Sequence, residues 1–264
     1  MGVNETVLVI DTSYGSTVGA VGYDPIVESD SRTHVEKLQV NIAKALKTAG
    51  LAPGDISGIV TGVGPAPFTG LRAGIVAAKA IAFATGAKLV GQNILEPQAW
   101  WNAERHGSAD DGLRVLTLAV NDARRKQLYF ELCQPASPDD AAHDARPLIA
   151  MDIDYPANIV ERVNDAVAAY ERRFDGRVVV DVVGHGAAKY SDALASIQLL
   201  GDIVDESVLD QGAHGLGIFA RRYDACDIAR GESPVEPLYL RRPDAEVPNP
   251  LKHVLGHGGV KAAR

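Results

Sequence analysis

Two aspartates in this sequence follow apolar runs that are typical of buried strands. Asp11 ends the first such run and is followed by two hydroxyl residues, and Asp122 closes a second run further along the chain. A strand-end aspartate can position Mg²⁺ or water, and the turn after it can hold a phosphate through hydroxyl and backbone N–H groups. The pattern predicts a nucleotide-binding site made of Asp11, Thr12, Ser13 and Asp122.

Phosphoryl transfer also requires a cation that neutralises the charge developing on the phosphate. No lysine or arginine lies between Asp11 and Arg32. This absence counts against autonomous phosphoryl transfer. It favours the alternative that Asp11 is a structural cap of the strand-end turn.

The histidines offer one further spacing with possible chemistry. His253 and His257 are four residues apart, which on a helix would place both on one face. Neighbouring prolines and glycines argue against a rigid helix there, so we predict no metal site. The sequence also shows no recognisable Ser/His/Asp or Cys/His spacing, which says little because catalytic triads assemble in space. We assign no catalytic residue.

A strand, a Gly/Pro elbow and a helix follow one another between Ile59 and Gly86. The elbow would place backbone N–H groups at a helix N-terminus, with Thr69 as the cap, where an anion is favoured. The alternative is a tight turn that binds nothing. A positive φ at Ala66 would strain the elbow.

The helix predicted over residues 70–85 is apolar on almost every side. Arg72 and Lys79 form its only polar stripe, and small residues are frequent along it. A helix that lies on a sheet is covered over only about half its circumference. We therefore expect another helix to pack on it, either within the chain or from another subunit.

Composition restricts the class of protein. The chain has 264 residues, 46% of them hydrophobic, and a net charge of −8, which argues against a protein that grips nucleic acid by itself. Two cysteines, Cys133 and Cys226, fit a reducing compartment. We find no signal peptide and no run of ~18 apolar residues, so we expect a cytoplasmic protein.

The order of predicted elements indicates an α/β fold with two lobes. The first lobe should hold three antiparallel strands, a helix, a strand, the helix just described, a strand and a helix; their ranges are 7–10, 16–22, 26–29, 33–49, 59–63, 70–85, 88–90 and from 95. The opening pattern recurs with strands at 114–120 and 127–133, a helix at 157–174 and a strand at 178–183. We predict two ribonuclease H-like lobes of the actin-like ATPase superfamily, the second one reduced.

The domain organisation follows from these elements. We expect an N-terminal lobe over residues 1–106, which binds a partner, and a smaller C-terminal lobe over residues 113–212. A helix within 213–231 should pack back across the lobes, and residues 243–264 should form a mobile tail.

Several motifs carry a resemblance to a known family. The segment GVGPAPFTGLRAGIVAAKAIAFATGAKLVG resembles the signature of the TsaB (YeaZ) family, as do VLVIDTS at 7–13, HVEKL at 34–38, DAR at 122–124, GHGA at 184–187 and PLYLR at 237–241. Ala66 and Pro67 stand where the family has Gly and Ser. His185 stands where the family commonly has Asp.

The resemblance implies a non-catalytic accessory subunit for making threonylcarbamoyladenosine in tRNA. Such a subunit pairs with a metal-bearing catalytic homologue, TsaD-like, and a TsaE-like ATPase assists turnover. The chain would have no cofactor of its own, ATP and Mg²⁺ would sit at the complex interface, and tRNA would be reached only through the complex. Alone it should form a homodimer, and the interface residues would be His34, Leu38, Phe68, Leu71, Ile75, Val76, Lys79 and Phe83.

Two other functions remain open at this point. One is an autonomous small-molecule kinase or ATPase with the actin-like fold, which needs a phosphate cleft with its own cation. The other is a peptidase, for which the sequence offers no matching nucleophile and base.

Overall fold

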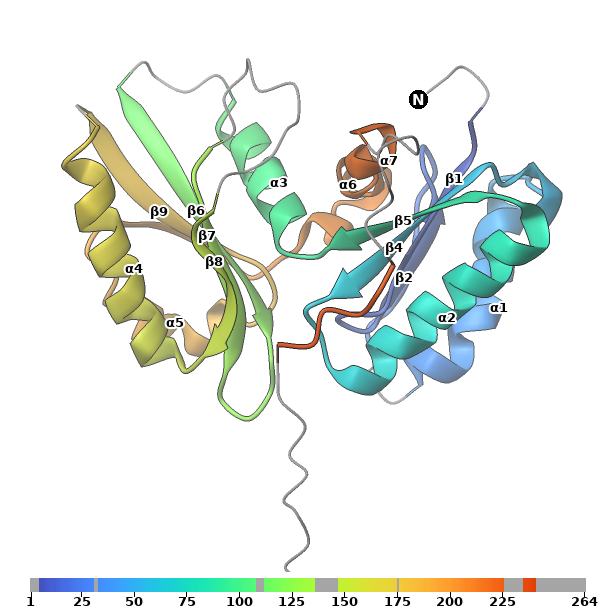
Figure 1. Ribbon diagram of the computed structural model, residues 1–264, viewed down its shortest axis with the longest axis horizontal. Coiled ribbons are helices and arrows are strands. Elements are labelled where there is room, and N and C mark those ends of the chain that lie inside the picture. Colours follow the sequence, from blue (N-terminus) through green and yellow to red (C-terminus); the bar gives the residue numbers. More distant parts are fainter. Residues whose placement is uncertain are drawn as a thin grey trace, which may run out of the picture.

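The computed structural model describes residues 5–30, 33–107, 112–135, 147–174, 176–225 and 235–240. It has two lobes, each built on a five-stranded mixed sheet, with helices on the outer faces and between the sheets (Figure 1). The predicted tail at 243–264, with His253 and His257, lies outside the described residues.

The first sheet has the strand order β3-β2-β1-β4-β5. Its strands are β1 (Val7–Asp11), β2 (Ser16–Ala20), β3 (Ile26–Glu28), β4 (Gly58–Gly64) and β5 (Lys88–Asn93). The three N-terminal strands pair antiparallel, whereas β4 is parallel to both β1 and β5. Helices α1 (His34–Thr48) and α2 (Phe68–Thr85) lie side by side on the outer face of this sheet (Figure 1).

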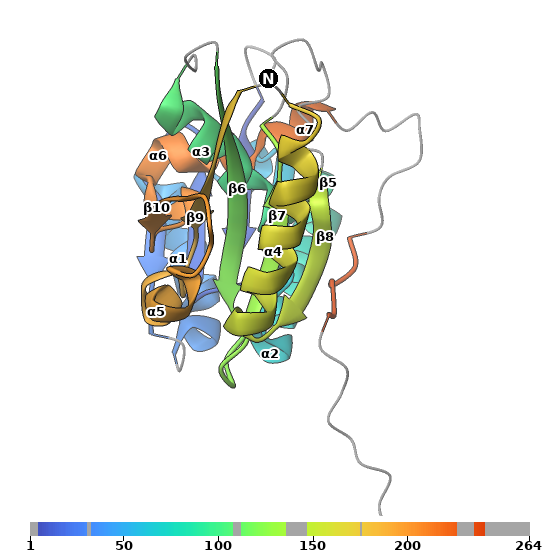
Figure 2. The ribbon, with the colours of Figure 1, turned by 90° about the vertical axis from the view of Figure 1, so that its left-hand side faces the viewer.

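The second sheet repeats this plan with the order β8-β7-β6-β9-β10. Its strands are β6 (Leu113–Asp122), β7 (Leu128–Cys133), β8 (Pro147–Asp154), β9 (Arg177–Val183) and β10 (Leu200–Val204). Helices α4 (Pro156–Glu171) and α5 (Ser191–Leu194) cover its outer face (Figure 2). Because α5 has only 4 residues against 18 in α2, the second lobe is the reduced one. The predicted two-lobe α/β fold is confirmed.

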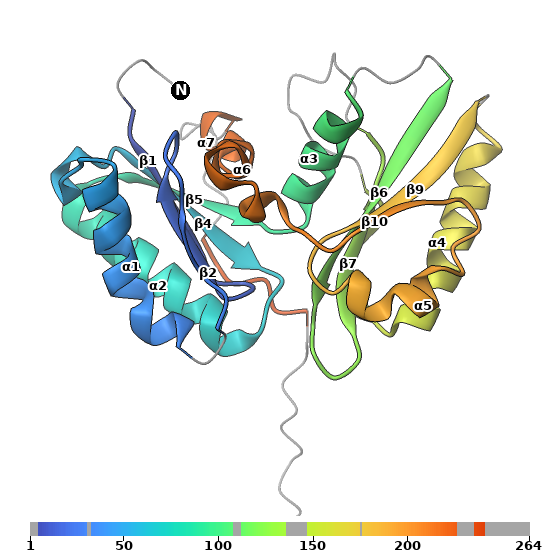
Figure 3. The same ribbon diagram turned by 180° about the vertical axis from the view of Figure 1, so that it is seen from behind.

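Three helices fill the space between the sheets. They are α3 (Glu96–His106), α6 (Gly212–Phe219) and α7 (Arg221–Ala225) (Figure 3). A shared core, including Val9 and Val90 of the first lobe, Ala119 and Val183 of the second and Phe219 of α6, joins the lobes. The late helix that we expected at 213–231 is interrupted after Phe219, and its two pieces contact β2, β4 and β5 of the first lobe.

Local predictions failed at helix starts and at the edges of the second sheet. Thr69 is not a cap, because α2 already begins at Phe68 with Pro67 as its N-cap residue, and Thr33 makes no capping hydrogen bond at α1. Ala66 does not have a positive φ, so the expected strain in the elbow is absent. Strands β8 and β10, the edge strands of the second sheet, were not predicted. Both are only half-buried, and in β10 Gly201 and Asp202 interrupt the apolar residues.

Helix α2 is long and apolar enough, by length and composition alone, to cross a membrane, with a mean hydropathy of 1.3 over 18 residues. From the sequence we expected no segment long and apolar enough to span a membrane, so α2 is an exception to that expectation. In this fold its inner side packs on β4, β1 and β5 of its own lobe. A buried helix of a protein core satisfies the same criterion.

Candidate functional site: the interlobe cleft and the outer surface of helix α2

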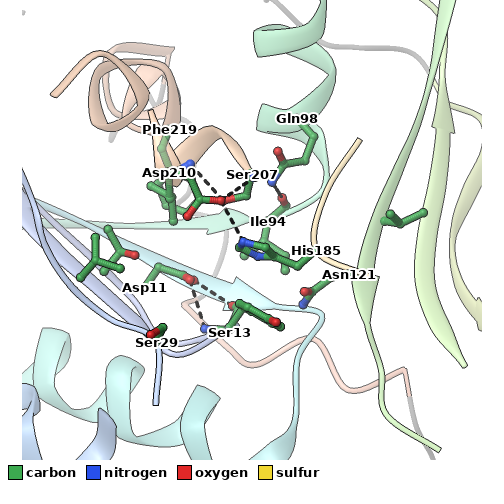
Figure 4. Close-up of a pocket in the computed structure, with 15 residues that line it drawn as sticks. Asp11, Ser13, Ser29, Ile94, Gln98, Asn121, His185, Ser207, Asp210 and Phe219 are labelled. Carbon is green, nitrogen blue, oxygen red and sulfur yellow. Dashed lines mark hydrogen bonds and ion pairs between the residues drawn. The ribbon is translucent and has the colours of Figure 1, made fainter. Parts of the chain in front are cut away.

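Two adjoining cavities lie between the lobes, next to the turn that follows β1. The smaller, of about 100 Å³, is drawn in Figure 4 and reaches from Asp11 to His185 and Asp210. The larger, of about 360 Å³, is lined by Thr12, Asp122 and the start of α2. Ser13, Tyr14 and Ser29 line both, so the two cavities form one cleft.

Asp11 is held at the floor of this cleft. It ends β1, is buried, and accepts hydrogen bonds from the backbone N–H (3.1 Å) and the Oγ (2.8 Å) of Ser13. Burial raises the pKa of the Asp11 carboxyl, against the opposing effect of the bonds from Ser13. The neighbouring position on β4 is Gly62, where a Cβ would overlap the Asp11 carboxylate. A glycine at this position therefore allows the carboxylate to sit beside β4.

Thr12 ties the β1 turn to the start of α2. Its Oγ1 donates a hydrogen bond to the carbonyl of Gly70 at 2.8 Å. Gly74, one turn further along α2, has no room for a Cβ because the Thr12 side chain occupies that space. This contact holds the first turn of α2 close to the β1 turn. Thr69 and Gly70 of that helical turn line the larger cavity.

The second lobe supplies cations that the local sequence around Asp11 lacks. Asp122, at the end of β6, pairs with the Nζ of Lys189 at 2.8 Å and accepts the backbone N–H of Arg124 at 2.9 Å. Arg124 also lines the larger cavity, opposite Thr12 and Ser13. The sequence prediction counted only residues near Asp11 and so missed Lys189 and Arg124. Arg124 is the last residue of the motif DAR, and Lys189 lies two positions after the motif GHGA, so these two motifs were the available signals for them.

His185 stands on the far side of the cleft. Its ring stacks on Tyr14 with centroids 3.9 Å apart. Its Nε2 lies 2.8 Å from the Oδ2 of Asp210 (Figure 4). Burial acts to raise the pKa of Asp210, but hydrogen bonds from His185 and Ser207 outweigh it and lower that pKa. The stack connects the β1 turn of one lobe with the turn after β9 of the other.

All four predicted nucleotide residues therefore border one cleft. Asp11 and Ser13 line the smaller cavity, and Thr12, Ser13 and Asp122 line the larger. The arrangement offers hydroxyl groups, the first turn of a helix and a guanidinium, which together suit a phosphate group.

The predicted interface residues divide into two sets. Phe68, Val76, Lys79 and Phe83 are exposed, with Phe83 94% and Val76 64% accessible. Leu38, Leu71 and Ile75 are buried within the chain, so their placement in an interface was wrong. Leu38 packs in the core beneath α1, and the other two lie under residues 235–240. The side chain of His34 lies outside what the structure describes.

Residues 235–240 form a short segment, called here the strap, that lies along α2 and the end of β4 (Figure 1). Val235 and Leu238 pack against Val63, Leu71 and Ile75. Tyr239 stacks on Phe68 at 5.1 Å and its hydroxyl accepts a hydrogen bond from Arg72 Nε, while Glu236 pairs with Lys79. The cover that α2 needed thus comes partly from a distant segment of the same chain. Residue spacing in the sequence did not predict this contact.

One group of metal-ligating side chains lies outside the cleft, at the end of α3. Ligand atoms of His106, Asp181 and Asp202 lie within 4.8 Å of one another. Arg105 forms an ion pair with Asp202 at 3.0 Å and lies 3.9 Å from Asp181, and His106 Nε2 is 2.6 Å from Asp181. Because Arg105 pairs with Asp202 and His106 is hydrogen-bonded to Asp181, we interpret the group as a polar network that anchors α3 to the second sheet.

The two sheets have the same strand order, and a cleft with strand-end aspartates lies between them. These features define a two-lobed protein with the actin-like topology. The sequence model of the family "TsaD: tRNA N6-adenosine threonylcarbamoyltransferase" matches residues 25–247, and the chain belongs to this family. The TsaB (YeaZ) resemblance seen in the motifs agrees with this membership.

Individual relatives agree with the family. An uncharacterized protein of Mycobacterium bovis is 33% identical over 198 residues, which cover 65% of this chain and 94% of that protein. The tRNA N6-adenosine threonylcarbamoyltransferase of Caulobacter vibrioides is 32% identical over 136 residues, covering 50% of this chain but only 36% of the transferase. The solved structure of YeaZ from Pseudomonas aeruginosa superposes with a TM-score of 0.63 at 22% identity, covering 89% of this chain and all (100%) of YeaZ, and shows the same fold.

Proposed function

We propose that this chain is the non-catalytic scaffold and activator subunit of a complex that transfers threonylcarbamoyl to the adenosine next to the tRNA anticodon. It would bind the metal-bearing catalytic homologue, TsaD-like, through α1 and α2. A TsaE-like ATPase would assist turnover, with ATP and Mg²⁺ at the complex interface. The family membership supports the pathway, and a cytoplasmic location fits it.

The observation that carries the proposal is the uncovered apolar side of α2. Phe83 is almost fully exposed and Val76 largely so, and Val40 of the neighbouring α1 is also exposed. Exposed large apolar side chains gathered on two adjacent helices are typical of a protein interface. The sheet and the strap cover the other sides, so these residues remain for a partner. Without the catalytic homologue, the same surface should form a homodimer.

The test is co-purification with the catalytic homologue from the same cell. Val76→Glu and Phe83→Glu should each abolish pairing, because a carboxylate would be buried in an apolar contact. Tyr155→Glu is the matched control, because Tyr155 is a similarly exposed apolar side chain in the second lobe. Normal pairing of the Phe83→Glu variant would refute the proposed surface.

An autonomous kinase or ATPase is the second candidate, and the cleft is the observation that favours it. Asp11 and Asp122 border the cleft and Arg124 lines it, as phosphoryl transfer would require. Against it, the ammonium of Lys189 is already paired with Asp122. Titration of the purified chain with ATP and Mg²⁺ separates the two. Tight binding with turnover by the chain alone would support the kinase.

A further inference from the structure

The turn between β6 and β7 carries three consecutive basic residues in an unusual conformation. Arg124, Arg125 and Lys126 have φ values of 60°, 50° and 64°, and all three are exposed. Left-handed backbone is uncommon in residues other than glycine, asparagine and aspartate, and it is found preferentially at functional sites. The turn is closed by the hydrogen bond from Gln127 N–H to the Arg124 carbonyl at 3.0 Å. Three basic side chains at such a turn therefore indicate a functional site for a negatively charged group.

An aromatic group lies close to this turn. Tyr239 of the strap stacks on Phe68 at the start of α2, and the guanidinium of Arg72 lies 3.8 Å from the centre of the Phe68 ring. Tyr239 is nevertheless 42% exposed and Phe68 53% exposed. Part of this aromatic surface is thus open to a further planar group.

The basic turn and the aromatic pair belong to one surface. Arg124 lines the larger cavity together with Pro67 and Thr69, the two neighbours of Phe68. The side-chain amide of Asn121, at the end of β6, donates to the Pro65 carbonyl at 3.4 Å. Figures 1 and 3 show the β6–β7 turn, the start of α2 and the strap at the same end of the molecule.

This surface is cationic in a chain whose net charge is −8. Arg72 and the three basic residues of the turn supply four positive charges. Among the described acids near them, Asp122 is paired with Lys189, Glu236 with Lys79, and Asp154, which lies opposite Leu128 of β7, with Arg162. Basic side chains beside open aromatic rings are the usual means of holding a single-stranded nucleic acid.

We propose that this surface, made of Phe68, Arg72, Tyr239 and the turn 124–126, holds an unpaired segment of RNA. A base stacks on the aromatic pair, and the turn neutralises the adjoining phosphates. Neither aromatic ring lines the cleft, so a mononucleotide bound in the cleft would not use them, whereas a strand that passes the mouth of the cleft would. This inference rests on the proposed function, because it names a surface of this chain that contacts the tRNA. It departs from the expectation that tRNA is reached only through the complex.

The test is fluorescence anisotropy of the full chain with a labelled hairpin RNA that has an unpaired loop, at about 50 mM salt, where phosphate contacts are strong. Tyr239→Ala should weaken binding roughly fivefold or more, the loss expected for one stacked base. Tyr239→Phe keeps the ring and should bind as the unmodified chain does.

The charge of the turn is tested by the combined variant Arg124→Asn, Arg125→Asn and Lys126→Asn, because asparagine tolerates left-handed backbone. The slope of log affinity against log salt should fall by about 2, since each phosphate contact on a single strand contributes ~0.7. The matched control replaces three exposed arginines in the second lobe, Arg172→Asn, Arg173→Asn and Arg177→Asn, and should leave the slope almost unchanged.

Three results would overturn the inference: no binding of the hairpin by the unmodified chain, equal binding of a blunt duplex RNA, or displacement of the hairpin by ATP. The last would indicate a mononucleotide site instead. Pairing with the catalytic homologue is measured separately. A chain that pairs normally but fails these RNA tests would refute the RNA surface alone.

Discussion

The backbone N–H of Leu238 lies 2.8 Å from the carbonyl of Val63, and this hydrogen bond fixes the strap to the end of β4. The side chain of Leu238 packs in the same place against Ala66, Leu71 and Ile75. The strap therefore hides two apolar residues of α2 that would otherwise join the exposed Val76 and Phe83. Which side of α2 remains for a partner depends on this contact.

Removal of the Leu238 side chain should loosen the strap without unfolding either lobe. Because Leu238 is only partly buried, we expect Leu238→Ala to lower the free energy of unfolding by about 1–2 kcal/mol, below the range for fully buried leucines. Urea unfolding measures this change. Glu236→Gln, which alters only an exposed ion pair of the same segment, should change it by less than about 0.5 kcal/mol. Equal effects of both variants would show that apolar packing does not hold the strap.

Adjacent residues on α2 should respond in opposite ways to the same substitution. Ile75 is 4% exposed and Val76 is 64% exposed. Ile75→Glu would bury a charge under the strap and should leave little folded protein, whereas Val76→Glu should change the unfolding free energy by less than about 0.5 kcal/mol. Circular dichroism with thermal unfolding distinguishes the two. Similar melting curves for both variants would contradict the packing of α2 described above.

Gly62 should tolerate no side chain. A Cβ at this position would overlap the buried carboxylate of Asp11, so Gly62→Ala should cost about 1–3 kcal/mol of unfolding free energy. Gly54→Ala is the matched control, because a Cβ there meets no atom within 4 Å and the backbone φ is not positive. Urea unfolding of the two variants gives the comparison, and an unchanged midpoint for Gly62→Ala would refute the close approach.

Glu131 on β7 should make stability depend on pH. Burial first, and the negative charge of Glu96 second, raise the pKa of Glu131 from 4.5 to about 7. Because the folded state holds the proton more tightly than the unfolded state, this residue makes stability fall as pH rises from about 4.5 to about 7. The loss should approach about 3 kcal/mol above that window.

Glu131→Gln keeps the shape of the side chain and removes the titration. The variant should therefore gain stability relative to the unmodified chain between pH values of about 5 and 8, as measured by urea unfolding at both. Glu171→Gln, which removes an exposed carboxylate at the end of α4, is the matched control. A constant difference between Glu131→Gln and the unmodified chain at both pH values would show that Glu131 is not protonated on folding.

The sequence was sufficient to predict the two-lobe fold and the acidic and hydroxyl residues of the cleft, but not its cations Lys189 and Arg124. Apolar runs such as residues 7–10 and 114–120 identify central strands because strands buried on both faces need a continuous apolar sequence. The aspartates that end those runs, Asp11 and Asp122, could be assigned to a cleft for the same reason. The edge strands β8 and β10 were not predicted, although the half-buried edge strands β3 and β5 of the first sheet were. In β10, Gly201 and Asp202 interrupt the apolar residues, so no run marks the strand.

The sequence by itself determined that the order of elements repeats, that α2 is apolar on nearly every side, and that an aspartate follows the first apolar strand of each half. These are local properties, since they depend on which residues lie a few positions apart. Tertiary structure alone decided that Lys189 pairs with Asp122 and that the strap covers Leu71 and Ile75. Both contacts join segments more than sixty residues apart, and chain folding rather than sequence spacing brings them together.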